Sequence, residues 1–187
     1  MAGSDRGEWA SGYAPLYCEE NVLRLCPSLG AGAFAVLVAN TSRRVEMLRQ
    51  RAGGPGRGAV AWDYHAFAIA PGGGWRVFDF DTTLGFPVAA RAYLRQSFLS
   101  GTETPPPLFR VVAALDYVRE FRSDRSHMRR ADGTWTASPP PWPPADGEGG
   151  MTLSRLLDPA DHCLGEVLTL PPMRGRFGCS VPHRGQD

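Results

Sequence analysis

Residues 59–70 read AVAWDYHAFAIA and carry an aspartate and a histidine within an otherwise apolar run. Such a run is typical of a buried strand, where polar side chains occur mainly with hydrogen-bonding partners. Side chains along a strand alternate between two faces, so we expect Asp63, His65 and Phe67 on the same face. Because an imidazole titrates near neutral pH, His65 is a candidate general acid or base.

A partner for His65 comes from the next apolar run, WRVFDFDTT at 75–83. Two strand-like runs around a glycine-rich stretch predict a β-hairpin. With a three-residue loop at 71–73, His65 lies directly opposite Asp79, at a Cβ separation of about 4.5–5.5 Å. A carboxylate there fixes the imidazole tautomer and leaves the second ring nitrogen free to act as a base. An even-length loop breaks this register.

A nucleophile for this pair is offered by Cys18, in the stretch YCEENVLRLCPSL at 17–29. The stretch predicts a short helix that starts just after Cys18, where unpaired backbone N–H groups favour a thiolate and could hold an oxyanion. Glu19 and Glu20 act in the opposite direction, because neighbouring negative charge raises a thiol pKa. The positive charge of protonated His65 has to outweigh their effect on the thiol pKa.

Each of these residues also has an ordinary structural explanation. Cys18 could be a small buried hydrophobe, and His65 a core residue with satisfied hydrogen bonds. Asp79 and Asp81 could cap the turn that follows their strand.

Two further alternatives concern ligands. Cys18, His65, His162 and Cys163 could form a zinc site, although adjacent His–Cys is a poor ligand spacing. The stretch SPPPWPP at 138–144 could be a polyproline II ligand for a partner domain, or a rigid loop that its tryptophan anchors on the core.

The remaining pattern predicts an α+β fold, because strands and helices mix without a βαβ rhythm. A central strand is expected at 33–39 and helices at 45–52 and 88–99. The later elements expected are a strand at 109–118, a loop at 131–150, a short helix at 151–157 and a last strand at 165–170.

Length and composition set the class of protein. A chain of 187 residues fits one domain, which we place at 16–178 between a mobile N-terminal tail at 1–15 and a C-terminal tail at 179–187. The formal net charge of +1 and the absence of basic blocks predict no nucleic-acid or membrane partner. Four cysteines without a CxxC pair indicate free thiols in a soluble intracellular protein.

Five strings occur in an order that is similar to that in a known family. They are YCEEN at 17–21, WDYH at 62–65, FDFDT at 78–82, SDRSHM at 123–128 and RFG at 176–178. In these strings the chain resembles the protein N-terminal glutamine amidohydrolases, the WDYHV-motif family, from about residue 16 to 178. The usual valine of that motif is Ala66 here, and its side chain is expected to point away from the His65 face.

The resemblance implies a triad of Cys18, His65 and Asp79, with no metal or organic cofactor. It implies a papain- or transglutaminase-like three-layer α-β-α sandwich with a mainly antiparallel sheet. The implied reaction converts an N-terminal glutamine of a protein or peptide to glutamate. Arginylation of that glutamate then marks the protein for degradation in the N-degron pathway, which links the enzyme to an arginyl-transferase. We expect a monomer in the cytosol and nucleus.

Selection of a terminal residue requires a group that binds its α-ammonium. Four acids are candidates that the sequence does not rank: Glu19, Glu20, Asp63 and Asp81. Recognition of glutamine over glutamate requires an acceptor for the amide NH₂. The same triad could instead cleave peptides or transfer the acyl group to an amine. We further expect Asp124 and Arg125 to pair and fix a loop, whereas the sequence assigns no role to His127.

Overall fold

The computed structural model describes residues 12–54, 58–99, 105–149, 151–162 and 164–179. Its centre is an open six-stranded sheet in the order β10-β7-β1-β4-β5-β6, with every neighbouring pair antiparallel. The strands are β1 (Phe34–Ala39), β4 (His65–Pro71), β5 (Trp75–Phe78), β6 (Val88–Ala89), β7 (Leu108–Ala113) and β10 (Glu166–Thr169). The predicted α+β class and the central place of strand 33–39 are confirmed.

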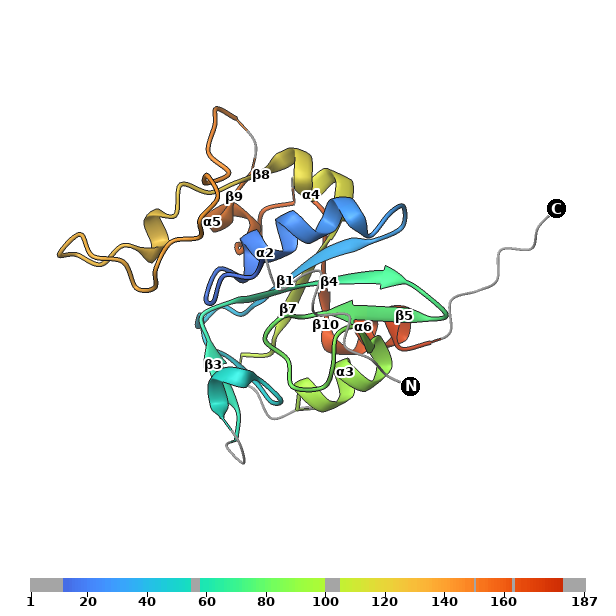
Figure 1. The fold of residues 1–187 in the computed structure, drawn as a ribbon. Helices are drawn as coiled ribbons and strands as arrows, with labels where there is room; N and C mark the ends of the chain where they lie inside the picture. Colours follow the sequence, from blue (N-terminus) through green and yellow to red (C-terminus); the bar gives the residue numbers. More distant parts are fainter. Residues whose placement is uncertain (1–11, 55–57, 100–104, 150, 163, 180–187) are drawn as a thin grey trace.

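Helices cover both faces of the sheet and complete three layers (Figure 1). One face carries α2 (Cys18–Leu25), α4 (Ala114–Glu120) and α5 (Leu153–Leu156), and the other carries α3 (Ala90–Ser97) and α6 (Leu170–Phe177). Each face of the sheet buries its own apolar cluster against these helices. Within the described ranges, no helix combines the length and apolar character needed to cross a membrane.

Shorter elements lie around this core. They are β2 (Val45–Met47), β3 (Val60–Trp62), β8 (Phe121–Arg122) and β9 (Met151–Thr152), with the 3₁₀ turns η2 (Cys26–Ser28), η3 (Arg51–Gly53) and η4 (Ser126–Met128). η2 directly continues α2, and Pro27 stands at its second position, so the α-helix ends after Leu25 as the proline predicted.

Two expectations about secondary structure are wrong, and one helix was not predicted. Residues 45–52 are not a helix: Val45 and Met47 alternate inward in β2, which pairs with β3. The strand expected at 109–118 ends at Ala113, where α4 begins. Helix α6 was not predicted; its two prolines occupy the first turn, where no backbone donor is needed.

The outer boundaries of the domain fall partly outside the described residues. Of the expected tails, residues 1–11 and 180–187 are not described. Tyr13, however, donates a hydrogen bond from its hydroxyl to Asp81 at 2.6 Å, so contacts with the core begin before residue 16.

Small side chains on β4 determine how closely α2 approaches the sheet. Ala66, Ala68 and Ala70 face the α2 side, whereas Phe67 and Ile69 face the opposite cluster. This is the alternation that the sequence predicted, with Ala66 pointing away from the Phe67 face. Methyl groups leave room for the helix, which brings its first residue to the backbone of Ala66.

The Pro-rich segment lies on the core through Trp142. Its indole N–H donates to Glu20 at 2.7 Å, and the guanidinium of Arg24 stacks on its ring at 4.5 Å. Arg125 donates to both Glu20 oxygens at 2.7 Å and to the Trp142 carbonyl at 2.9 Å. The tryptophan-anchored loop is therefore what the structure shows. The expected pairing of Arg125 with Asp124 is wrong, because Asp124 accepts from the backbone N–H of Ser126 instead.

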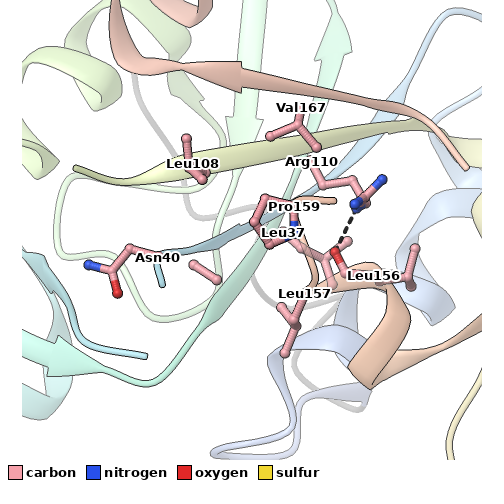
Figure 2. A pocket seen from close by; sticks show the side chains of 9 residues that line it. Leu37, Asn40, Leu108, Arg110, Leu156, Leu157, Pro159 and Val167 are labelled. Atoms are coloured by element: carbon pink, nitrogen blue, oxygen red, sulfur yellow. Dashed lines mark hydrogen bonds between the residues drawn. The ribbon is translucent and has the colours of Figure 1, made fainter. Parts of the chain in front are cut away.

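A second buried arginine fixes the segment between α5 and β10. Arg110 on β7 is buried beside a hollow of about 10 Å³, room for about one water molecule (Figure 2). Its guanidinium donates to the backbone carbonyls of Leu156, Asp158, Asp161 and Leu164. The arginine thus joins the segment between α5 and β10 to the sheet through four backbone carbonyls, and the hollow beside it is too small for a ligand larger than water.

The Glu20–Arg125 pair gives a test of the fold. Replacement Arg125→Met leaves the Glu20 carboxylate buried without its cation, which costs about 3–5 kcal/mol. Chemical denaturation should show that loss in the free energy of unfolding. As a control, Arg129→Met removes an exposed guanidinium that stacks on Trp135 at 4.1 Å, and should cost no more than about 1 kcal/mol. A loss below about 1 kcal/mol for Arg125→Met would contradict this role.

Candidate active site

His65 and Asp79 form a buried hydrogen-bonded pair. The distance from His65 Nε2 to Asp79 Oδ1 is 2.9 Å, and both residues are 1% exposed. His65 begins β4 and pairs with Val38 at the end of the ladder with β1. The ring of Trp62 stacks on its imidazole at 5.4 Å. The carboxylate therefore accepts from Nε2–H, and Nδ1 is the nitrogen left for chemistry.

The structure makes this pair by a route different from the predicted one. The hairpin turn is Gly72–Gly74, with Pro71 opposite Trp75, so the predicted loop at 71–73 is wrong by one residue. The β4–β5 ladder ends at the Ala68–Phe78 pair, before it reaches Asp79. Asp79 contacts His65 because the chain turns just after Phe78, which brings the carboxylate back toward the start of β4.

Asp79 is held in place by several donors. Its Oδ1 also accepts from the backbone N–H of Asp81 at 2.8 Å, so it caps the turn as well as binding His65. Its Oδ2 accepts from the Tyr93 hydroxyl at 2.9 Å and from Gln50 Nε2 at 3.2 Å. These bonds come from α3, from the segment after β2 and from the turn, and they fix the carboxylate from three directions.

Charge and burial act against each other in this pair. Burial disfavours the ions and by itself lowers the pKa of His65 and raises that of Asp79. The charge of each partner and their hydrogen bond outweigh burial, so the pKa of His65 lies above its ordinary value and the pKa of Asp79 below. His65 therefore stays protonated to a higher pH in this site than an imidazole does in water.

Cys18 occupies the first position of α2 and is 8% exposed. Burial raises the pKa of its thiol well above the ordinary value, and the negative charges of Glu19 and Asp81 raise it further. A hydrogen bond with the backbone of Ala66 acts in the other direction. The helix start therefore does not make a free thiolate at neutral pH, and a base has to take the proton from this thiol.

One cavity of about 270 Å³ brings these groups together. Its wall comprises Leu16 and Cys18 at the head of α2, residues 62–65 at the β3–β4 junction, Asp81 after β5, and His127, Met128 and Thr136 after β8. Cys18 and His65 thus share one wall, and His65 Nδ1 is buried with no hydrogen-bond partner. A nucleophile, an imidazole with one available nitrogen and a buried acid are the parts needed for acyl transfer.

The four acids proposed for the α-ammonium occupy different environments. Asp63 and Asp81 line the cavity. Glu20 does not line it, and its two oxygens are bound by Arg125 and Trp142. Glu19 lies beside the nucleophile, since Cys18 Sγ is 3.6 Å from its Oε2. The structure thus brings two of the four to the cavity wall and gives Glu20 an anchoring role.

Several residues of the site carried no recognisable signal in the sequence. Tyr64 donates from its hydroxyl to Glu19 at 2.8 Å and lies 3.3 Å from His127 Nε2. His127 comes from η4, more than 60 residues later, and lines the cavity. Its place in the SDRSHM string was the one available clue, and it gave no role.

The proposed zinc site finds no support in the described residues. Cys163 lies outside them, and the one group of three with ligand atoms within 4.8 Å is His65, Asp79 and Asp81. Two members of that group already bind each other, and Asp81 accepts from Tyr13. These contacts explain the cluster as a hydrogen-bonded network.

Comparison with known proteins identifies one family. The sequence model of a family described as N-terminal glutamine amidase matches residues 13–177. Proteins named protein N-terminal glutamine amidohydrolase from Drosophila melanogaster and Drosophila erecta are each 38% identical to this chain over 175 residues, and one from Drosophila willistoni is 39% identical. Each alignment covers 87% of this chain and 80% of the relative.

The raised thiol pKa of Cys18 gives a test of the site. Alkylation by iodoacetamide needs the thiolate, so labelling of Cys18 should be slow at pH 7 and should rise only at pH values above the ordinary thiol pKa of about 8.5. Mass spectrometry of the digested protein measures the labelled fraction, with the exposed Cys179 as internal reference. Labelling of Cys18 at pH 7 as fast as that of Cys179 would refute the assignment of a protonated resting thiol.

Proposed function

The chain belongs to the N-terminal glutamine amidase family and is a hydrolase that acts on amides, and from this premise we propose its substrate and mechanism. The substrate is a protein or peptide with an N-terminal glutamine, whose side-chain amide is hydrolysed to give glutamate and ammonia. The proposed mechanism rests on one observation. Asp79 holds His65 by Nε2 and leaves Nδ1 without a partner, on the wall of the cavity that holds Cys18.

The first half of the reaction makes a thioester. His65 Nδ1 takes the proton from the Cys18 thiol, and the thiolate attacks the carboxamide carbon to form a C–S bond. Backbone N–H groups at the head of α2 stabilise the oxyanion. Protonated His65 then gives its proton to the nitrogen, the C–N bond breaks, and ammonia leaves. Asp79 stabilises the imidazolium while it exists, and the same interaction raises the pKa of His65.

The second half hydrolyses the thioester. Water gives a proton to His65 Nδ1 and attacks the same carbon, after which the C–S bond breaks. The sulfur is released and the proton returns to it, which restores the Cys18 thiol. The products are a γ-carboxylic acid and ammonia; the acid then ionises to the carboxylate, and its proton converts ammonia to ammonium. Water supplies the oxygen that replaces the amide nitrogen. None of these steps requires a metal or an organic cofactor.

Specificity for the terminal residue is assigned to acids on the cavity wall. A free α-ammonium is the feature that distinguishes residue one from an internal glutamine. Asp63 and Asp81 line the cavity and remain the candidates for binding it. Asparagine is one methylene shorter, so its carbonyl carbon falls short of Cys18 when its ammonium is bound, which favours glutamine.

The cellular part of the proposal rests on the family resemblance. We propose that the new N-terminal glutamate is a substrate for arginylation, which commits the protein to N-degron degradation in the cytosol and nucleus. We further propose that the enzyme acts as a monomer. Loss of turnover of an N-terminal-glutamine reporter in cells that lack the enzyme, together with sedimentation of the purified protein, tests these two statements.

The nucleophile and the terminal specificity can be tested together. A peptide with N-terminal glutamine should gain the mass of one deamidation at residue one, and Cys18→Ala should abolish this while the circular-dichroism spectrum stays unchanged. The same peptide with one added leading residue should not react. Residual turnover by Cys18→Ala would exclude Cys18 as the nucleophile, and equal turnover of the extended peptide would exclude terminal specificity.

Asp79→Asn tests the role of the acid. Asparagine cannot stabilise the imidazolium, so kcat should fall by about 10²- to 10⁴-fold. Asp79 is what keeps the pKa of His65 above its ordinary value against the effect of burial, so its removal lowers that pKa. The low-pH limb of the kcat/KM profile should therefore move to lower pH. An unchanged limb with an unchanged kcat would show that Asp79 does not act on His65.

A further inference from the structure

The cavity-lining residues Trp62 and His65, and Glu19 next to the cavity-lining Cys18, carry buried polar atoms that have no hydrogen-bond partner in the protein. These atoms are Glu19 Oε1, Trp62 Nε1 and His65 Nδ1. Buried polar atoms are nearly always paired, so each exception calls for an explanation. His65 Nδ1 is explained by the proton transfers above. Glu19 Oε1, an oxygen of a buried acid, is not used by the mechanism.

Glu19 is fully buried and lies against the nucleophile. Its Oε2 accepts from the Tyr64 hydroxyl at 2.8 Å and lies 3.6 Å from Cys18 Sγ. Its Oε1 lies 3.5 Å from His127 Nε2, within ion-pair distance when that imidazole is protonated but without hydrogen-bond geometry. Tyr64 thus binds Oε2, the oxygen that contacts the reacting sulfur, and His127 borders Oε1, which is left as the acceptor without a hydrogen bond on the same carboxylate.

We propose that Glu19 recognises the carboxamide NH₂ of the substrate glutamine and keeps its hydrogen bond to the nitrogen as ammonia leaves. This assignment rests on the proposed function and extends it to the residue that distinguishes glutamine from glutamate. Tyr64 and His127 are positioning residues, since they act through Glu19.

The distances fit a contact with the amide nitrogen. Before attack, sulfur and carbonyl carbon are about 3–3.5 Å apart, and the amide nitrogen is about 1.33 Å from that carbon. The nitrogen therefore lies next to the same sulfur that Glu19 touches. The α-nitrogen is four bonds away from the carbon, at roughly 4–5 Å, so the amide and the ammonium call for separate acceptors. This separates Glu19 from Asp63 and Asp81, which serve the ammonium.

The charge of the Glu19 carboxylate favours binding of the substrate amide over binding of the product γ-carboxylate. A glutamine amide offers two N–H donors, and a charged acceptor makes a hydrogen bond about twice as strong as a neutral one. The product γ-carboxylate offers no donor and carries the same charge as Glu19. The same side chain therefore attracts the substrate amide and repels the product carboxylate.

A competing explanation is that Glu19 only changes the pKa of the Cys18 thiol. Its negative charge raises the pKa of the Cys18 thiol, second only to burial. Removal of that charge makes the thiolate easier to form. If tuning were its whole role, Glu19→Gln would speed both alkylation of Cys18 and amide hydrolysis, whereas amide recognition predicts that the two rates change in opposite directions.

The experiment compares two leaving groups on one peptide. Wild type and Glu19→Gln act on a peptide with N-terminal glutamine and on the same peptide with the γ-methyl ester of glutamate, which has no N–H. Both substrates form the same thioester, so their rate ratio isolates the first step. Rates are corrected for spontaneous cyclisation in enzyme-free blanks. We expect Glu19→Gln to lower the amide-to-ester ratio of kcat/KM at least tenfold, with faster alkylation of Cys18.

Glu20→Gln is the matched control, since it removes the neighbouring buried charge outside the cavity and should leave the ratio unchanged. Tyr64→Phe frees Glu19 Oε2 from its donor and should lower the ratio by less than Glu19→Gln does. An unchanged ratio in Glu19→Gln, or amide hydrolysis that rises with alkylation, overturns the inference and leaves the proposed function standing. Failure of the wild-type protein to release ammonia from the glutamine peptide overturns both.

Discussion

The buried hydrogen bond between His65 and Asp79 is the interaction on which the rest of the site depends. Two ionisable groups out of water are stable only when their mutual attraction and further donors offset the loss of hydration. Here Tyr93, Gln50 and the backbone of Asp81 supply those donors. The elements that carry them lie far apart in the sequence, so the fold has to be complete before the imidazole is oriented.

Much of this architecture could be predicted from the sequence because its signals are local. Strand 33–39, helix 88–99 and the first helix follow from apolar periodicity and from Pro27. The errors arise where pairing between distant segments determines the secondary structure. Residues 45–47 form a strand because they pair with β3, and β5 ends at Phe78, which leaves Asp79 beyond the β4–β5 ladder.

The catalytic candidates of the site were also predictable, because their signals are local. Cys18, His65 and Asp79 have residue types and neighbours that indicate acyl-transfer chemistry, although the hairpin register meant to join two of them is wrong. Environments were not predictable, because they depend on residues from distant segments. Glu19 and Glu20 are adjacent and chemically alike, yet one meets Tyr64 and His127 and the other meets Arg125 and Trp142.

The first turn of α2 directs three successive side chains to three different destinations. Cys18 supplies the sulfur, Glu19 lies beside it with a buried oxygen, and Glu20 fastens the segment around Trp142. One residue inserted into a helix rotates all later side chains by about 100° about the axis. A single insertion or deletion in this turn would therefore misdirect these groups together. Changes of length are better tolerated in a segment such as 131–149, which has no helical phase to preserve.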